Sequence, residues 1–179
     1  LMKKNNLKLL INFFLIILFN GCEDEQAIKQ NNAIINTISV TTSNVNQSFF
    51  YYDLVNQSEI DSSENWHLAL ETKGTYNMPS IIFEGVYVAE YLDILFDDMT
   101  ESPSTFMQDY IQDNQQFEYE GENEILTYDM SSHTVSVKNP DHIYVIYEPA
   151  GHTTYKVQFI EYLSGILVFS FSQFSNDEL

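Results

Sequence analysis

Residues 142–171 read HIYVIYEPAGHTTYKVQFIEYLSGILVFSF and contain three runs of β-branched and aromatic residues, at 142–147, 154–160 and 166–171. Runs of this kind, whose side chains alternate between two faces, are typical of β-strands. Turn residues separate them at 149–152, which includes a proline and a glycine, and at 163–165. The stretch therefore predicts an antiparallel meander of three strands.

Shorter runs of the same composition occur upstream, at 49–54, 66–70, 81–83, 86–88 and 134–137. In the second of these, Trp66, Leu68 and Leu70 alternate and are expected to share one face. The predicted fold class is all-β, or a β-rich α+β domain. Its predicted architecture is a β-sandwich-like antiparallel domain that ends in the three-strand meander.

Helical periodicity is confined to the middle of the chain. Five apolar residues recur there at helical spacing, which predicts a short helix at 89–98. They are Ala89, Leu92, Leu95, Phe96 and Met99. Residues 105–113 are compatible with another turn or two of helix. The stretch 97–123 is acidic and has little periodicity, so it predicts a long excursion from the sheets. Long connections inside compact domains are more often functional than idle.

The N-terminal segment, MKKNNLKLLINFFLIILFNGC at residues 2–22, has three lysines followed by an apolar run from 9 to 19. This run is shorter than the ~20 residues that a membrane-spanning helix needs, but it suits the hydrophobic region of a secretory signal. The ending Gly21-Cys22 resembles a bacterial lipoprotein signal, in which the cysteine becomes the lipidated N-terminus. The predicted organisation is a signal peptide at 1–21, a tether at 22–36 and a folded β domain at 37–179.

Three acidic residues at 23–25 follow the predicted lipidation site, Cys22. They resemble the export tag that sends some Gram-negative lipoproteins to the outer face of the outer membrane, or else they form a solvated spacer. The first alternative predicts a protein that is lipid-anchored in the outer membrane and exposed on the cell surface. The lipid would then be its contact with the membrane.

The charge balance argues against two classes of partner. Residues 22–179 carry all 26 acidic side chains but only four lysines, and the whole chain has no arginine. Nucleic-acid binding depends on Lys and Arg that displace counterions from phosphates, and docking on anionic lipid depends on the same side chains. We therefore expect neither. The single cysteine also excludes a disulfide framework.

No motif for catalysis stands out. The chain has no H-E-x-x-H, no nucleophile elbow, no P-loop and no dinucleotide fingerprint. Acidic residues are so numerous that a carboxylate pair of the glycosidase kind carries no information. The alternating glutamates at 118–124 are either a weak calcium site or, as we favour, a solvated edge strand or loop. We predict a protein that is not an enzyme and has no catalytic residues.

Four segments, in this order, resemble the HmuY-like family of haem-binding bacterial lipoproteins. They are FYYDL at 50–54, WHLAL at 66–70, FDDMTESP at 96–103 and the closing strands at 128–171. The resemblance covers roughly residues 37–174. It implies extracellular capture of haem for uptake by an all-β domain, with two axial ligands to the iron, His or Met, supplied by loops.

Under that resemblance, Met99 and His133 are the best pair of axial ligands. Met99 lies in the third segment, and His133 lies 34 residues later, near the start of the fourth. Met107 and Met130 form a second pair, and Met78 is a further candidate. Each also has an ordinary interpretation, because methionines commonly fill gaps in a core and His133 suits a polar loop or a strand cap.

The absence of arginine bears on the propionates of haem, which arginine holds best. Only Lys73, Lys138, Lys156, hydroxyl groups and backbone amides remain to meet them. Either the propionates project into solvent or the domain binds something else. The alternative function is an outer-membrane interaction module that recognises a protein or a glycan through exposed aromatic residues, without haem. An outer-membrane receptor is a further expected partner of a haem-binding form.

Overall fold

The computed structural model describes residues 36–111, 121 and 123–175. The predicted signal peptide, the lipidation site Cys22 and nearly all of the tether lie outside these residues. The elements are β1 (Ile38–Thr41), β2 (Phe50–Asp53), β3 (Ser58–Glu59), β4 (Leu68–Lys73), β5 (Met78–Phe83), β6 (Tyr87–Tyr91), α2 (Phe106–Asp109), β7 (Leu126–Asp129), β8 (Thr134–Val137), β9 (Ile143–Glu148), β10 (Thr153–Leu163) and β11 (Ile166–Gln173).

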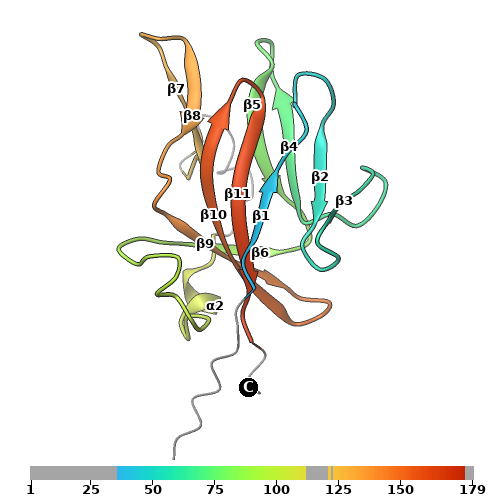
Figure 1. The fold of residues 1–179 in the computed structure, drawn as a ribbon. Helices are drawn as coiled ribbons and strands as arrows, with labels where there is room; N and C mark the ends of the chain where they lie inside the picture. Colours follow the sequence, from blue (N-terminus) through green and yellow to red (C-terminus); the bar gives the residue numbers. More distant parts are fainter. Residues whose placement is uncertain (1–35, 112–120, 122, 176–179) are drawn as a thin grey trace, which may run out of the picture. The chain divides into compact units, whose positions relative to one another are not determined.

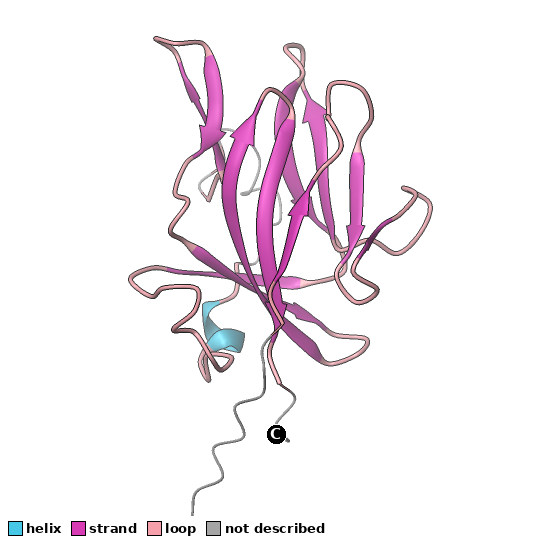
Figure 2. Cartoon of the chain, in the orientation of Figure 1, coloured by secondary structure: helices cyan, strands magenta, loops and turns pink. Residues whose placement is uncertain are grey.

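Two antiparallel sheets form the body of the domain (Figure 1). One has the strand order β1-β11-β10-β9-β6 and the other β3-β2-β4-β5, while β7 and β8 pair as a separate hairpin. In the described part of the chain, strands dominate and helix is confined to one short element (Figure 2), which confirms the predicted all-β fold class. The meander is also confirmed, because β10 pairs with β9 on one side and with β11 on the other.

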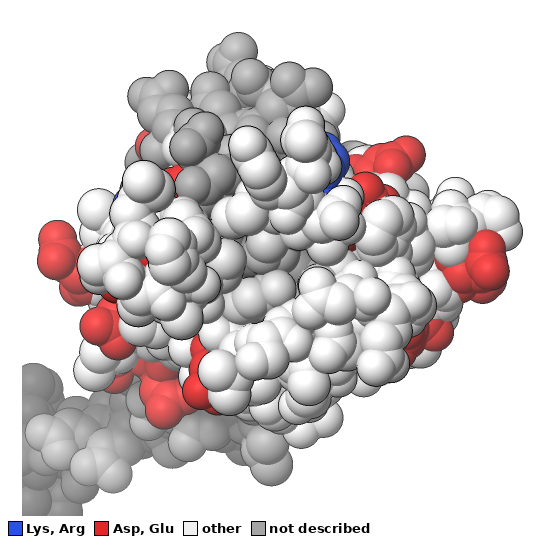
Figure 3. All heavy atoms as spheres, turned by 90° about the horizontal axis from the view of Figure 1, so that it is seen from above, with Lys and Arg blue, Asp and Glu red and all other residues white. Residues whose placement is uncertain are grey.

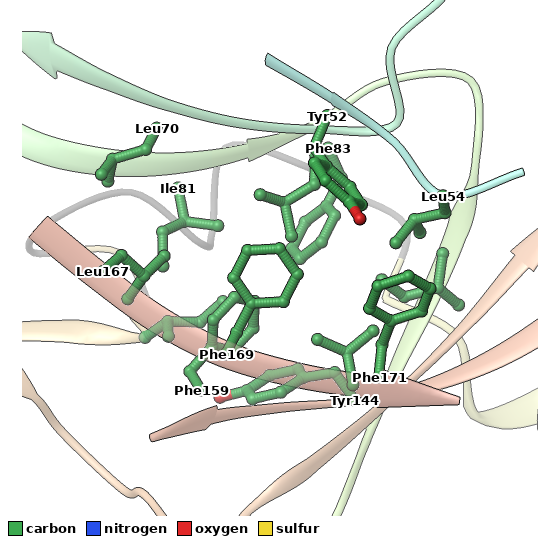
Figure 4. Close-up of a cluster of buried hydrophobic side chains, with 14 of the residues drawn as sticks. Tyr52, Leu54, Leu70, Ile81, Phe83, Tyr144, Phe159, Leu167, Phe169 and Phe171 are labelled. Atoms are coloured by element: carbon green, nitrogen blue, oxygen red, sulfur yellow. The ribbon is translucent and has the colours of Figure 1, made fainter. Parts of the chain in front are cut away.

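The main hydrophobic core lies between the two sheets, because alternate residues of each strand point into it. From the five-stranded sheet it receives Tyr144, Phe159 and Phe169, and from the other sheet Leu70 and Phe83 (Figure 4). The rings meet edge to face, with centroids 5.3 Å apart for the Tyr144–Phe159 pair. Such contacts add to the free energy of burying large apolar surfaces.

A second, smaller hydrophobic cluster covers the face of β9 that points away from the main core. Ile143 and Val145 point into it and meet Phe96, Met99 and Phe106 from the segment between β6 and β7. β9 is thus buried on both faces, which explains why its sequence is apolar at nearly every position rather than alternating.

The predicted helix at 89–98 is wrong. Ala89 pairs with Val145 as part of β6, and the chain then turns irregularly through Asp93, whose φ of 62° lies in the left-handed region. The helical spacing arises because Phe96 and Met99 fold back onto the sheet. The short α2 falls within the expected 105–113, whose last two residues lie outside the described part.

The alternation predicted around Trp66 is also wrong at its first position. Trp66 precedes β4 and packs on Tyr51, with ring centroids 5.4 Å apart, whereas Leu68 and Leu70 enter the main core. Strand periodicity does not extend to a residue outside the strand. Of the predicted excursion at 97–123, most of the glutamate run lies outside the described residues. No helix in the described part is long and apolar enough to span a membrane.

Candidate functional site

Four connections between strands meet at one end of the domain: the β1–β2 loop, the β4–β5 turn, the β7–β8 turn and the β10–β11 turn (Figure 1). Together they line an open pocket of about 790 Å³, which we call the hairpin-end pocket. Its lining consists of Asn46, Tyr76, Asn77, Met78, Pro79, Tyr128, His133, Thr134, Val135, Tyr162, Leu163, Ser164 and Gly165. The volume lies in the range of pockets that hold small organic ligands and cofactors.

The β10–β11 turn is fixed by an asparagine-containing loop. Asn44 donates a hydrogen bond from Nδ2 to the carbonyl of Ser164 at 3.1 Å, and the backbone N–H of Val45 donates to the carbonyl of Gly165 at 2.8 Å. Ser164 and Gly165 have φ values of 52° and 94°. Glycine suits the second position because it adopts left-handed conformations without steric cost.

The β7–β8 turn is held by the carboxylate of Asp129. It accepts hydrogen bonds from the backbone N–H and hydroxyl of Ser131, both at 2.7 Å, and from the hydroxyl of Ser132 at 2.8 Å. These donors lower the pKa of Asp129 to about 2. The backbone N–H of His133 donates to the carbonyl of Asp129 at 2.8 Å, which closes the turn with His133 at a φ of 55°.

His133, at the end of this turn, is one of the residues that line the hairpin-end pocket. Its Nδ1 lies 2.6 Å from the hydroxyl oxygen of Tyr128, and the two rings are 6.0 Å apart at their centroids. Among the described residues, Nε2 of His133 has no hydrogen-bond partner. An exposed imidazole with one nitrogen anchored and the other open is a suitable metal ligand.

The remaining walls are apolar or neutral. Met78 and Pro79 begin β5, and Tyr162 is a buried wall residue whose burial raises its phenol pKa. Among the residues that the structure describes, no Lys, Arg, Asp or Glu lines the pocket. Figure 3 looks down on this end and shows mostly uncharged side chains around a central hollow, while the acidic side chains lie mainly toward the outline of the molecule.

Of the three lysines that could meet haem propionates, two form interactions with other parts of the domain. Lys156 is buried and donates hydrogen bonds from Nζ to the backbone carbonyls of Phe96 and Met99. Lys138 forms an ion pair with Glu124 at 3.3 Å. Lys73 lies directly across from Met78 in the β4–β5 pairing, beside the pocket.

The structure does not bring either predicted ligand pair together. Met99 is 3% exposed and packs in the smaller cluster, and Met107 is exposed on α2. His133 and Met130 lie in the β7–β8 turn. Figure 1 shows α2 and that turn at opposite ends of the strands, so each predicted pair is divided between the two ends. The further candidate, Met78, does share the hairpin-end pocket with His133.

Two of the other histidines bind carboxylates away from this pocket. Nδ1 of His67 lies 3.2 Å from a carboxylate oxygen of Asp53, and Nδ1 of His142 lies 2.5 Å from Glu90. Neither of them lines the pocket, which distinguishes His133 from both.

Sequence reasoning missed the partner of His133, although a signal for it exists. The pattern Y-[DE]-x3-H-T occurs twice, at 128–134 and at 147–153. In the second copy, Nδ1 of His152 lies 2.7 Å from the hydroxyl of Tyr147, and Glu148 accepts hydrogen bonds from the turn as Asp129 does. The hairpin sequence therefore builds the tyrosine–histidine pair locally at both turns.

The residues of the hairpin-end pocket fit haem, the cofactor that the sequence resemblance implies. They offer an imidazole nitrogen from His133, a thioether sulfur from Met78 and aromatic rings, which are the side-chain types that bind haem iron and pack against a porphyrin. No group of three or more His, Cys, Asp or Glu in the described residues is arranged to hold a metal ion by itself.

No protein-family model and no curated protein matches this sequence. Among solved structures, the chain is similar to the apo form of an HmuY analog from Tannerella forsythia, with 10% sequence identity and a TM-score of 0.54. The alignment covers 77% of this chain and 96% of the Tannerella chain. The likeness supports an HmuY-like fold for this domain.

Proposed function

We propose that this domain binds haem, or a related tetrapyrrole, in the hairpin-end pocket and holds it without chemical conversion. The observation that carries the proposal is the placement of His133, which lines a pocket of about 790 Å³ and whose Nε2 has no hydrogen-bond partner among the described residues. The HmuY-like fold supports the same conclusion.

The side chains at this end would hold the ligand in two ways, as axial ligands to the iron and as surfaces that pack on the porphyrin. Haem iron supplies axial positions that accept imidazole nitrogen or thioether sulfur. His133 is the first donor. Met78 replaces Met99 as the second donor because it lines the same pocket, while the rings of Tyr76 and Tyr162 provide surfaces for the porphyrin.

Neutral donors would meet the propionates. The pocket contains the side-chain amides of Asn46 and Asn77 and the hydroxyls of Thr134 and Ser164. Lys73 lies beside the pocket, across from Met78. Neutral hydrogen bonds to a carboxylate are weaker than charged ones, so most of the binding free energy would come from the iron ligands and from apolar contact.

The cellular role follows from the N-terminal segment and belongs to the same proposal. Cys22 would carry the lipid, the segment at 22–36 would tether the domain to the outer membrane, and the pocket would capture haem at the cell surface for uptake through a receptor. Metabolic labelling with palmitate tests the anchor. Label should enter the wild-type chain and be absent from the Cys22→Ser variant.

A titration with haemin tests the ligand. We expect a shifted Soret band in the wild type and a much weaker response in His133→Ala. The matched control is His152→Ala, since His152 has the same hairpin geometry outside the pocket and should leave the titration unchanged. An unaltered haemin spectrum with excess wild-type protein would refute the proposal.

A second candidate function rests on the opposite end of the domain. Tyr87, Leu92, Leu95 and Met107 are 41%, 54%, 67% and 59% exposed, and exposed apolar groups of this kind favour a protein-binding surface. This function predicts no Soret shift, and it predicts capture of an outer-membrane partner that is lost in Leu95→Ser. Retained capture by that variant would contradict it.

A further inference from the structure

The hydrogen bond between Tyr128 and His133 can run in two directions. A neutral imidazole has one N–H and one nitrogen with a free lone pair. If the Tyr128 hydroxyl donates to Nδ1, the proton of the ring sits on Nε2. If Nδ1–H donates to the tyrosine oxygen, Nε2 has the free lone pair. Both arrangements satisfy the observed separation of 2.6 Å.

Only one direction allows His133 to ligate iron. His133 lines the pocket, and its Nε2 has no hydrogen-bond partner among the described residues, so Nε2 is the ring nitrogen that remains to bind a ligand there. It can donate a lone pair to iron when the proton resides on Nδ1. In that state, the oxygen of Tyr128 must act as the acceptor.

We propose that Tyr128 is a positioning residue for the iron ligand, an inference that rests on the haem-binding function proposed above. Its oxygen accepts the Nδ1–H of His133, which fixes the tautomer, orients the ring and makes Nε2 a stronger donor to ferric iron. Partners of this kind beyond the metal ligand typically change metal affinity 10–100-fold.

The hydrogen bond between Tyr128 and His133 is formed by the hairpin itself, without a ligand. A similar tyrosine–histidine separation, 2.7 Å, recurs at Tyr147 and His152, where the sequence pattern is repeated and neither residue lines the hairpin-end pocket. The geometry is therefore a property of the local turn rather than a consequence of packing against a ligand. A ring that is already oriented loses less freedom on binding, which favours affinity.

Tyr128 could instead serve only as part of the pocket wall. The two roles differ in their dependence on iron. A wall residue contacts any porphyrin, whereas a partner of the axial ligand affects only a porphyrin that carries a metal.

The experiment compares Tyr128→Phe with wild type and with the matched control Tyr147→Phe. Each protein is titrated with haemin and with metal-free protoporphyrin IX, and the reduction potential of bound haem is measured. For Tyr128→Phe, we expect haemin affinity to fall roughly 10-fold, protoporphyrin affinity to stay at the wild-type value, and the reduction potential to rise because a weaker donor stabilises ferric iron less. Tyr147→Phe should match the wild type in all three measurements. Unchanged protoporphyrin binding also shows that the variant is folded.

Three results would overturn the inference, and they differ from one another. Wild-type haemin affinity and potential in Tyr128→Phe would leave the haem function standing and remove Tyr128 from it. An equal loss of haemin and protoporphyrin affinity would make Tyr128 a wall residue. Absence of haemin binding by the wild type would overturn the proposed function and this inference together.

Discussion

Gly165 lies in the β10–β11 turn, and even its replacement by alanine should disturb the hairpin-end pocket. It has a φ of 94°, and a Cβ placed there would lie 2.3 Å from Oδ1 of Asn44 and 2.4 Å from Nδ2 of Asn46. We expect Gly165→Ala to lower the free energy of unfolding by about 1–3 kcal/mol through backbone strain, with a further loss as the asparagines move.

Urea denaturation followed by circular dichroism measures this effect. The control is Gly74→Ala, because Gly74 also has a positive φ, 72°, but open space where a Cβ would be. The Gly74→Ala variant should therefore lose only the part of the free energy of unfolding that comes from backbone strain. Equal losses in the two variants would mean that Asn44 and Asn46 do not restrict this turn.

Lys156 is a second residue with a sharply defined role. It is 2% exposed, its Nζ lies 4.3 Å from the ring centroid of Phe96, and it donates to two carbonyl groups of the 92–105 segment. In Lys156→Met, both carbonyl oxygens lose their donor, and each such buried acceptor costs about 1–3 kcal/mol. We expect a clear fall in the denaturation midpoint.

Lys138→Met provides the comparison, since the Lys138 side chain is 40% exposed in its ion pair with Glu124, and ion pairs at the surface contribute at most about 1 kcal/mol. If the two lysine variants unfold at the same urea concentration, Lys156 does not hold the 92–105 segment to the sheet.

At the residue scale, the sequence indicated which side chains could bind iron but not which of them would meet. His133 could be placed in a turn before a strand, and it lies there. Met99 could be recognised as either packing or ligand, and its burial against Phe96 and Phe106 is now visible. Whether two residues 34 positions apart share a pocket depends on tertiary contacts that no spacing encodes.

At the scale of elements, the β7–β8 hairpin depends on an ionised Asp129. Hydrogen bonds from the hydroxyl and N–H of Ser131, and then from Ser132, lower its pKa from 3.8 to about 2. Because the folded value lies below the unfolded one, the ionised form stabilises the turn above about pH 4, and this contribution is lost as the pH falls towards 2.

Amide signals of Ser131 and His133 in NMR spectra should therefore move together between pH 4 and pH 2, the interval in which Asp129 is protonated. The Asp129→Asn variant keeps an acceptor oxygen without an ionisable group, so its turn should show no such change. A wild-type turn that is insensitive to this pH range would contradict the assigned role of the carboxylate.

The elements themselves were largely predictable. The closing strands alternate strongly and are separated by proline- and glycine-containing turns, so both their existence and their antiparallel order followed from the sequence. The segment after β6 was not predictable, because Phe96 and Met99 imitate helical spacing while they cover the second face of β9. Periodicity reports burial on one side of an element, and it cannot distinguish a helix from a loop folded over a sheet.

At the scale of the whole molecule, charge should oppose the binding of an anionic ligand. The chain has 26 acidic residues against 7 basic ones, and haem carries two propionates. Screening weakens this repulsion, since the Debye length falls from about 30 Å at 0.01 M salt to about 8 Å at 0.15 M. Haemin affinity should therefore rise with ionic strength.

Titrations at the two salt concentrations measure this dependence, and the dimethyl ester of haemin serves as the comparison that lacks the two carboxylates. Because only the positive charge of the ferric centre remains in the ester, its affinity should not rise with salt. A haemin affinity that falls with salt would instead indicate that lysine side chains hold the propionates.

The position of the pocket is also a property of the whole molecule. Four turns that are distant in sequence converge because the sheet order places β5, β10 and β11 so that their ends meet the β7–β8 hairpin. The sequence predicted strands and turns, but which turns gather at one end follows from strand order, and this required the structure.

The most direct test of the account is an NMR titration with gallium(III) protoporphyrin, a diamagnetic analogue of ferric haem. The account predicts that the backbone amides of Asn77, His133 and Ser164 shift on binding while those of Met99 and Phe106 stay in place. Shifts confined to Met99, Phe106 and their neighbours, or no shifts at all, would contradict a tetrapyrrole site in the hairpin-end pocket.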